Sequence, residues 1–153
     1  MEKYKRMEDH SKIKWSQIDD NIYIGTNQCC QIHFDKELLL QGITTDISLE
    51  DVKIDSPFGV ESYLWLPTKD HTASSQDQLR LGVAHLTQLI NVGRKVYVHC
   101  RNGHGRAPTL VAAYYISTGL SVEEATNKIK NKREEVHLND EQIEALELFA
   151  ENI

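Results

Sequence analysis

Apolar positions along the chain follow two periods, one typical of strands and one typical of helices. Short runs rich in apolar and β-branched residues at 43–49, 60–66 and 96–98 predict three strands. Between the second and third runs, apolar side chains recur at a helical spacing over 75–92, and Gly93 is placed to end that helix. The predicted buried face of the helix is formed by Leu79, Val83, Leu86 and Ile90.

The remaining parts of the chain add elements of both kinds. Two short runs at 14–18 and 21–25, separated by Asp19 and Asp20, predict an antiparallel hairpin. The other predicted helices are 26–41, which Gly42 would end; one from Pro108 to about Gly119; 121–132, opened by a capping box of Ser121 and Glu124; and a last one opened by Asn139 and Gln142.

Helices and strands therefore alternate, which indicates an α/β fold. We expect a three-layer sandwich with a central, mostly parallel sheet of four or five strands and helices on both faces. The 153 residues suit a single domain over 14–153. Residues 1–13 are charged and aperiodic, and we expect them to form a loose lead-in.

Composition and charge narrow the class of ligand. The chain is 40% hydrophobic and 26% charged, which is ordinary for a globular protein, and its formal net charge is −6. A negatively charged surface is unsuited to coating nucleic acid, so we expect no nucleic-acid partner. An anionic ligand would have to be held by a local pocket.

Cysteine content and hydropathy bear on the location of the protein. Three cysteines are too few for a disulfide framework and suit a reducing compartment. The first nine residues lack the apolar core of a signal peptide, and no apolar run approaches the length of a membrane span. We therefore expect a cytoplasmic protein that does not insert into a membrane, and we expect a monomer.

The loop between the strand at 96–98 and the helix at Pro108 carries the candidate chemistry. A helix start offers unpaired N–H groups and the positive end of a dipole, so a loop above it can bind a phosphate-sized anion. Gly103 and Gly105 allow such a loop to curl, because they have no Cβ. At its ends lie Cys100, a nucleophile when deprotonated, and Arg106, whose guanidinium can hold two phosphoryl oxygens.

His99, Cys100, Gly103 and Arg106 form the pattern His-Cys-x-x-Gly-x-x-Arg. This pattern resembles the signature of the cysteine-dependent protein tyrosine phosphatases, and within them the small dual-specificity phosphatases. The resemblance implies a phosphatase that uses a cysteinyl-phosphate intermediate and needs no metal or other cofactor. Cys100 would attack phosphorus, His99 would support the loop, and the phosphate would be bound by Arg101, Asn102, Gly103, His104, Gly105 and Arg106.

A second stretch with little apolar content, 67–75, is a candidate source of the proton that the leaving oxygen needs. Asp70 lies thirty residues before Cys100, and in the family a general-acid aspartate occupies a loop at a comparable distance. The same carboxyl group would later activate the water that hydrolyses the intermediate. Two alternatives stay open: Asp70 is a solvated loop carboxylate, or the acid is Asp77, which also suits the first turn of the helix at 75–92.

One position departs from the family pattern. A serine or threonine usually follows the arginine, where its hydroxyl stabilises the sulfur that departs in the second step, but this chain has Ala107. We therefore expect slow hydrolysis of the intermediate and accumulation of phosphoenzyme. The sequence Arg-Ala-Pro is also found in the glucan-phosphatase branch of the family, so Ala107 does not by itself imply an inactive protein.

The sequence leaves the substrate open. By analogy with the family, a compact chain suits phosphoproteins carrying phosphotyrosine, phosphoserine or phosphothreonine. Arg101 and His104 add potentially cationic groups around the loop. Branches of the family that handle inositol phospholipids carry basic residues at these positions, so the resemblance implies a polyanionic substrate such as an inositide as an alternative, with a glucan or an RNA end as weaker ones. Arg101 could instead brace the loop against an acidic neighbour. A third reading is a catalytically weak module that binds phosphate groups on a partner.

The other cysteines are weak candidates for chemistry. Cys29, Cys30 and His33 lack the second pair of ligands that a structural zinc site needs, so we expect buried thiols and no metal. Cys29 or Cys30 could pair with an oxidised Cys100 if it lies nearby, as a cysteine does in some relatives of the family.

Overall fold

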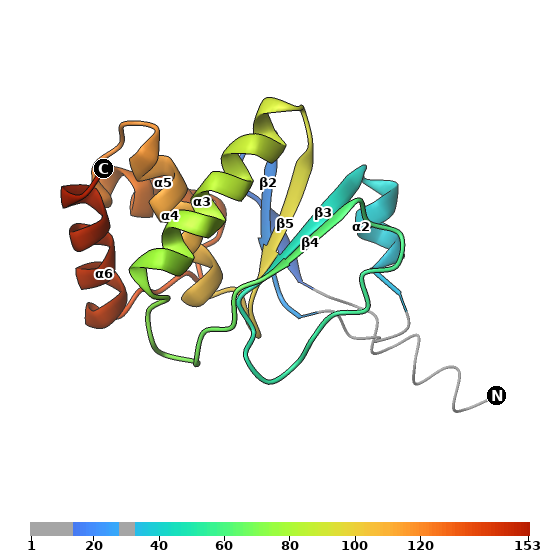
Figure 1. The fold of residues 1–153 in the computed structure, drawn as a ribbon, viewed down its shortest axis with the longest axis horizontal. Helices are drawn as coiled ribbons and strands as arrows, with labels where there is room; N and C mark the ends of the chain where they lie inside the picture. The colour runs from blue at the N-terminus through green and yellow to red at the C-terminus, as the bar shows by residue number, and fades with distance from the viewer. Residues whose placement is uncertain (1–13, 28–32) are drawn as a thin grey trace.

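A five-stranded sheet organises residues 14–27 and 33–153, which are the residues that the computed structural model describes (Figure 1). The strand order is β1-β2-β5-β3-β4. Only β1 pairs antiparallel to its neighbour, and the other pairs are parallel. The strands are β1 (Trp15–Gln17), β2 (Ile22–Gly25), β3 (Ile43–Ser48), β4 (Ser62–Trp65) and β5 (Lys95–His99). The predicted α/β fold with a mostly parallel sheet is confirmed.

Helices lie on both faces of the sheet, as predicted, but unequally (Figure 1). One face carries α3 (Gln76–Asn91), α4 (Arg106–Ser117), α5 (Val122–Lys132) and α6 (Asp140–Glu151), whereas the other carries only α2 (Lys36–Leu40) among the described helices. Within the same described parts of the chain, no helix is both long enough and apolar enough to cross a membrane.

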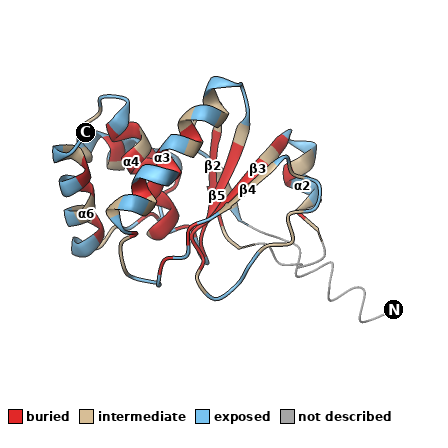
Figure 2. Ribbon diagram, viewed as in Figure 1, coloured by how far each residue is buried: buried red, intermediate tan, exposed pale blue. Residues whose placement is uncertain are grey.

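The central strand β5 shows how alternation along a strand produces two cores. Val96 and Val98 point into the larger cluster beneath the four helices, while Tyr97 points into a smaller cluster with Phe34 and Leu38. Figure 2 shows the three central strands β2, β5 and β3 and the inward faces of the helices as mostly buried. Because both faces of β5 are covered, the residues that follow it start from a rigid, buried position.

The capping signals located most helix starts correctly. The predicted capping boxes at Ser121 and Asn139 are formed, and Ser75 forms a third with Gln78 at the start of α3. Helix α4 starts at Arg106, two residues before the predicted Pro108. The loop is therefore shorter than expected, and its arginine belongs to the first turn of the helix.

The helix predicted over 26–41 is wrong in its length. Asp35 is the N-cap, since its side chain accepts hydrogen bonds from the N–H groups of Glu37 and Leu38, and α2 has only five residues. Gly42, at φ +82°, follows the helix as predicted. The lead-in over 1–13 and both Cys29 and Cys30 lie outside the described residues.

Candidate active site

The loop from β5 to α4 has the strand-loop-helix geometry that the sequence predicts. Cys100 directly follows β5 and is 3% exposed, and Arg106 opens α4. Gly103 has φ +68°, and a Cβ there would lie 2.8 Å from the carbonyl oxygen of Gly25. Glycine is therefore required at position 103 both by backbone conformation and by the close approach of β2.

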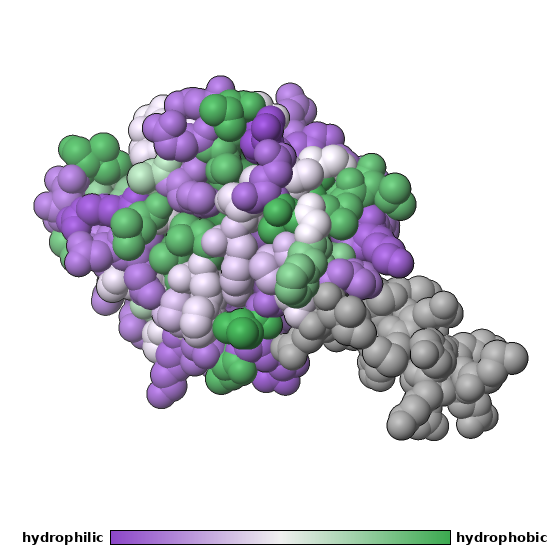
Figure 3. All heavy atoms as spheres, turned by 45° about the vertical axis from the view of Figure 1, so that its right-hand side comes forward, coloured by the Kyte–Doolittle hydropathy of each residue, from purple (hydrophilic) through white to green (hydrophobic). Residues whose placement is uncertain are grey.

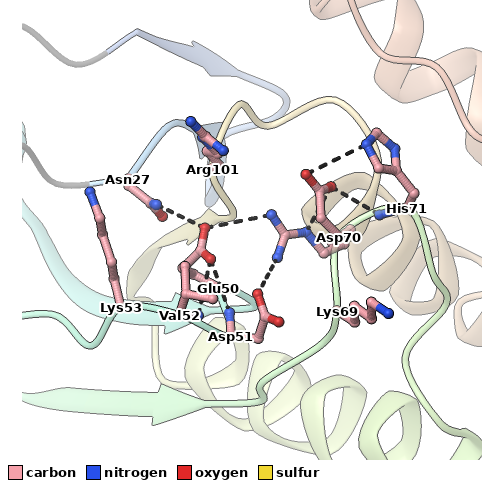
Figure 4. A pocket seen from close by; sticks show the side chains of 10 residues that line it. Asn27, Glu50, Asp51, Val52, Lys53, Lys69, Asp70, His71 and Arg101 are labelled. Atoms are coloured by element: carbon pink, nitrogen blue, oxygen red, sulfur yellow. Dashed lines mark hydrogen bonds and ion pairs between the residues drawn. The ribbon is translucent and has the colours of Figure 1, made fainter.

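Arg106 is buried beside three carboxylates that come from two other parts of the chain. Its Nη1 donates to the carbonyl oxygen of Thr68 at 2.9 Å. Ion pairs join the guanidinium to Glu50 at 3.5 Å, Asp51 at 3.3 Å and Asp70 at 3.5 Å; Figure 4 shows how the three carboxylates converge. Arg106 is thus oriented from several sides before any ligand arrives.

Two hollows meet at the loop. The first, of about 440 Å³, is lined by Cys100, Asp70 and Arg106, with Arg101, Asn102, His104 and Gly105 of the loop and His71, His137, Asn139 and Gln142 around them. The second, of about 550 Å³, shares Asp70, His71, Arg101 and Arg106, and is otherwise lined by Asn27, Glu50, Asp51, Val52, Lys53 and Lys69 (Figure 4). The structure therefore brings nearly all predicted site residues to one place; of these residues only Gly103, which packs against Gly25 of β2, and His99 line neither hollow.

Asp70 occupies the rim of the first hollow. Its side chain is 47% exposed, its Oδ1 accepts the N–H of His71 at 2.9 Å, and the same oxygen faces Arg106. The competing residue, Asp77, lines neither hollow and pairs with Arg80 at 2.9 Å on the surface of α3. Of the two carboxylates, only Asp70 lies in the space that Cys100 and Arg106 share.

His99 turns away from the loop, to the side of the sheet that carries α2. Its Nδ1 lies 3.0 Å from Asn27 Oδ1, and its Nε2 lies 2.6 Å from Asp55 Oδ2 and 3.2 Å from Asp46 Oδ1. The ring also stacks on Tyr97, with 5.3 Å between centroids. The hydrogen bonds of the His99 ring thus join β5 to the segment after β2 and to the loop after β3, and an ion pair joins it to β3.

Arg133, which the sequence analysis did not single out, holds the loop from behind. It follows α5 directly, is 3% exposed, and donates to the carbonyl oxygens of Gly103 at 3.0 Å and Asn102 at 2.9 Å. A third bond reaches Ser16 Oγ at 2.9 Å. No local sequence signal marks this role, because all three partners are distant in the chain.

Two further residues of the site were missed. Gln142 donates to the carbonyl oxygen of Thr72 at 3.3 Å and so ties α6 to the loop that carries Asp70. Glu50 accepts a hydrogen bond from Asn27 at 2.9 Å and is 2% exposed. Burial alone would raise the pKa of Glu50, but the hydrogen bonds from Asn27 and the backbone and the charge of Arg106 lower it. Glu50 could have been found from its position just after a parallel strand, at the same sheet edge as Cys100.

Comparisons with known proteins agree with this geometry. Residues 22–152 match the family model described as dual specificity phosphatase, catalytic domain. The human protein named phosphatidylglycerophosphatase and protein-tyrosine phosphatase 1 is 38% identical over 97 residues, which cover 62% of this chain and 48% of that protein. The Arabidopsis thaliana phosphatidylglycerophosphate phosphatase PTPMT2 is 28% identical over 148 residues, which cover 89% of this chain and 62% of that protein.

Solved structures extend the likeness to the whole fold. The crystal structure of PTPMT1 in complex with PI(5)P superposes with a TM-score of 0.76 at 26% identity, covering 91% of this chain and 96% of that one. Human DUSP28, at 19% identity and a TM-score of 0.78 over 90% of this chain and 93% of that one, shares the fold. The chain spans about half the length of the mammalian phosphatidylglycerophosphatases that it matches. On the match over 22–152, together with the loop geometry, the chain belongs to the dual specificity phosphatase catalytic-domain family.

Proposed function

We propose that the chain is a cysteine-dependent phosphatase that hydrolyses phosphomonoesters through a cysteinyl-phosphate intermediate. The observation that carries the proposal is the shared hollow: a thiol, a guanidinium and a half-exposed carboxyl group from two separate loops line one space. These are a nucleophile, an anion clamp and a proton donor, which are the three groups that phosphoryl transfer to an enzyme needs.

In the first step, the thiolate sulfur of Cys100 attacks phosphorus and the bond to the leaving oxygen breaks. Asp70 gives its proton to that oxygen, so the product leaves as an alcohol or phenol. The loop N–H groups and Arg106 hold the other phosphoryl oxygens, which carry the charge throughout the transfer. The carboxylates of Asp51 and Asp70, 30% and 47% exposed, can move aside as phosphate takes their place at Arg106.

In the second step, water attacks the phosphorus of the cysteinyl phosphate while Asp70, now ionised, takes a proton from it. The sulfur–phosphorus bond breaks, inorganic phosphate forms, and the cysteine returns as a thiolate. The residue after Arg106 is Ala107, which is fully buried in the first turn of α4 and offers the departing sulfur no hydroxyl. We therefore place the slow step here.

Phosphoproteins are the first candidate substrate class, as expected from the family resemblance. A phosphorylated lipid headgroup is the second, favoured by the hollow next to the loop, where Lys53, Lys69 and Arg101 can meet further negative charge. Exposed apolar side chains flank it: Val52 is 77% exposed, and Ile54 and Phe58 follow on the same loop. Figure 3, which brings the right-hand side of Figure 1 forward, shows apolar patches among polar ones on that face. The names of the human and plant relatives also point to phospholipids.

The test is hydrolysis of para-nitrophenyl phosphate in EDTA and reductant by the wild type, Cys100→Ser and Asp70→Asn, with Asp77→Asn as the matched carboxylate control. We expect turnover that is lost in Cys100→Ser, strongly reduced in Asp70→Asn and unchanged in Asp77→Asn. Phosphopeptides and a dispersed phosphatidylglycerophosphate would then rank the two substrate classes. If the wild type bound phosphate but turned over none of these substrates, the chain would be an interaction module.

We also propose a cytoplasmic location, because a reducing compartment suits a reactive thiol.

A further inference from the structure

The segment that links β3 to β4, residues 49–61, reverses the usual pattern of burial. Two of its carboxylates point inward: Glu50 is 2% exposed, and the side chain of Asp55 is 6% exposed. Three of its apolar side chains point outward: Val52 is 77%, Ile54 57% and Phe58 73% exposed. Single exposed apolar residues are ordinary, but three on one segment beside buried carboxylates are not. The segment therefore presents an apolar surface that the fold itself does not use.

Contacts near both ends of the segment hold its backbone in this arrangement. In Figure 1 the segment swings out beyond the end of β3 before it returns to β4. Near its start, Glu50 Oε1 accepts the N–H of Val52 at 3.2 Å. Near its end, the carbonyl oxygen of Phe58 accepts the N–H of Phe34 at 3.2 Å. The backbone at these positions is thus satisfied by the protein, while the apolar side chains stay outside.

The anchor in the middle of the segment is an ion pair. Asp55 Oδ2 lies 2.6 Å from His99 Nε2, and Asp46 Oδ1 lies 3.2 Å from the same nitrogen; we call His99, Asp46 and Asp55 the buried cluster. Burial alone would lower the pKa of His99, but the charges and hydrogen bonds of the two carboxylates outweigh burial and raise it to about 10. Burial raises the pKa of Asp46 to about 8, against the opposing charge of His99. A charged contact therefore fastens the segment to β5.

Cations accompany the apolar side chains at the mouth of the pocket. Lys53, Lys69 and Arg101 are exposed and line the same hollow as Val52, and Figure 4 shows them on different sides of it. The carboxylates of this hollow pair with Arg106, and none of them forms an ion pair with the three cations in the part of the chain that the structure describes. The mouth therefore carries unpaired positive charge on a chain whose net charge is −6.

Apolar side chains interleaved with cations match the surface of an anionic lipid membrane. Such a surface offers negative headgroups to cations and, just beneath them, acyl chains to apolar groups. Val52, Lys53 and Ile54 have this alternation along the chain. A soluble phosphate ester would use the cations but leave the apolar side chains in water. The two features together therefore favour a lipid surface.

We propose that this segment is a peripheral membrane-binding surface, whose three exposed apolar side chains enter the headgroup region of an anionic bilayer while the three cations contact its phosphates. Val52 lines the hollow that shares Arg106 with the pocket of Cys100, so this contact brings the pocket against the membrane. A phosphomonoester headgroup can then reach Cys100 while its acyl chains stay in the bilayer. The inference deepens the proposed function and rests on its second substrate class, but binding to the membrane needs no turnover.

Sedimentation with lipid vesicles measures the contact without any reaction, using the full chain with Cys100→Ser. We expect binding to equal parts of phosphatidylcholine and phosphatidylglycerol that weakens as salt rises, and much weaker binding to phosphatidylcholine alone. Ile54→Ser/Phe58→Ser should lower the partition coefficient by about tenfold. The matched control Leu81→Ser/Val92→Ser removes side chains that are 60% and 62% exposed and should change nothing. A wild type that binds no vesicles, or equal losses in the two variants, would overturn the proposal.

A second pair of variants tests the cations. Lys53→Gln/Lys69→Gln should lower binding to the mixed vesicles by about tenfold or more. Lys130→Gln/Lys132→Gln changes the net charge equally at exposed positions in the last turn of α5 and should lower binding much less. Equal losses in both variants would mean that net charge alone controls binding, and would overturn the assignment to this surface.

Kinetics separate this surface from the proposed function. With phosphatidylglycerophosphate in the mixed vesicles, Ile54→Ser/Phe58→Ser should lower kcat/KM by about tenfold, whereas turnover of para-nitrophenyl phosphate should stay that of the wild type. Unchanged kinetics on the vesicles would overturn the proposal. So would a loss of turnover on a soluble phosphopeptide without any vesicle binding, which would assign the surface to a protein partner. A chain that binds vesicles through these residues but hydrolyses no phosphate ester would contradict the proposed function and support the membrane contact.

Discussion

Two cation–carboxylate clusters share one edge of the sheet, and they differ in access to solvent. The buried cluster holds His99 with Asp46 and Asp55. A second set, which we call the pocket cluster, holds Arg106 with Glu50, Asp51 and Asp70. Both draw carboxylates from β3 or the segment that follows it. Two carboxylates of the pocket cluster are 30% and 47% exposed, whereas the buried cluster is sealed.

This difference in exposure gives the clusters different capacities. Water and an incoming phosphate can replace Asp51 and Asp70 at Arg106, so the pocket cluster can exchange its partners during a reaction. The partners of His99 cannot be exchanged without exposing a buried charge, which is costly. One cluster therefore suits substrate binding, and the other suits a fixed charge that a catalytic cycle leaves unchanged.

The largest expected effect comes from altering the pocket cluster. Arg106→Lys keeps the positive charge but loses the planar fork that grips two oxygens, so kcat should fall by about 10²- to 10³-fold. Steady-state kinetics with para-nitrophenyl phosphate measure the loss. Arg94→Lys is the matched control, because Arg94 makes an exposed ion pair with Glu61. If Arg106→Lys retained a tenth or more of wild-type turnover, the reaction would not need a guanidinium that exchanges carboxylate partners for phosphate.

The buried cluster should instead appear in the pH dependence of stability. The pKa values of His99 and Asp46 are raised in the folded protein. The folded protein therefore binds more protons than the unfolded chain, and the free energy of unfolding should fall as the pH rises. For His99 the window runs from 6.5 to about 10, and for Asp46 from 3.8 to about 8. Each proton contributes at most about 1.4 kcal/mol per pH unit.

Urea unfolding at pH 6.5, 7.5 and 8.5 measures this slope. The wild type should lose stability at each step. The double variant Asp46→Asn/Asp55→Asn should show a much flatter profile, because the carboxylates that raise the pKa of His99 and the titratable group at position 46 are both removed. Equal slopes in the two proteins would assign the pH dependence to other groups and would remove the distinction between the clusters.

The pocket side of this comparison could be predicted from the sequence, because its signals are local. Cys100, Gly103 and Arg106 lie within seven residues, and the strand before them and the helix after them are marked by apolar runs. Asp70 was found from the resemblance to a family together with its position on a polar loop. That it lies beside Arg106 follows from the fold, which the alternation of helices and strands indicated.

The buried side could not be predicted, because its signals depend on long-range packing. An aspartate such as Asp46 in a strand is ordinarily read as a solvent-facing residue, and it is buried here only because this face of β3 is covered as well. Asp55 lies in a segment without regular structure, 44 residues from its partner His99. The helix over 26–41 was predicted too long for a related reason. Phe34 lies at a helical spacing from Leu38 in the sequence, but it belongs to the bend before α2, where its ring contacts Tyr97 of β5.

The smallest expected effect concerns the residue next to Arg106. Ala107→Ser places a hydroxyl beside the departing sulfur, and one hydrogen bond of about 1 kcal/mol in the second transition state corresponds to about a fivefold rise in kcat. Rapid mixing with para-nitrophenyl phosphate should show a burst of nitrophenol in the wild type and a smaller one in the variant. Ala113→Ser, also fully buried in α4, controls for burying a hydroxyl. A wild type without a burst, or a variant with unchanged turnover, would mean that formation of the intermediate limits the rate. The absence of a hydroxyl at position 107 would then not slow the reaction.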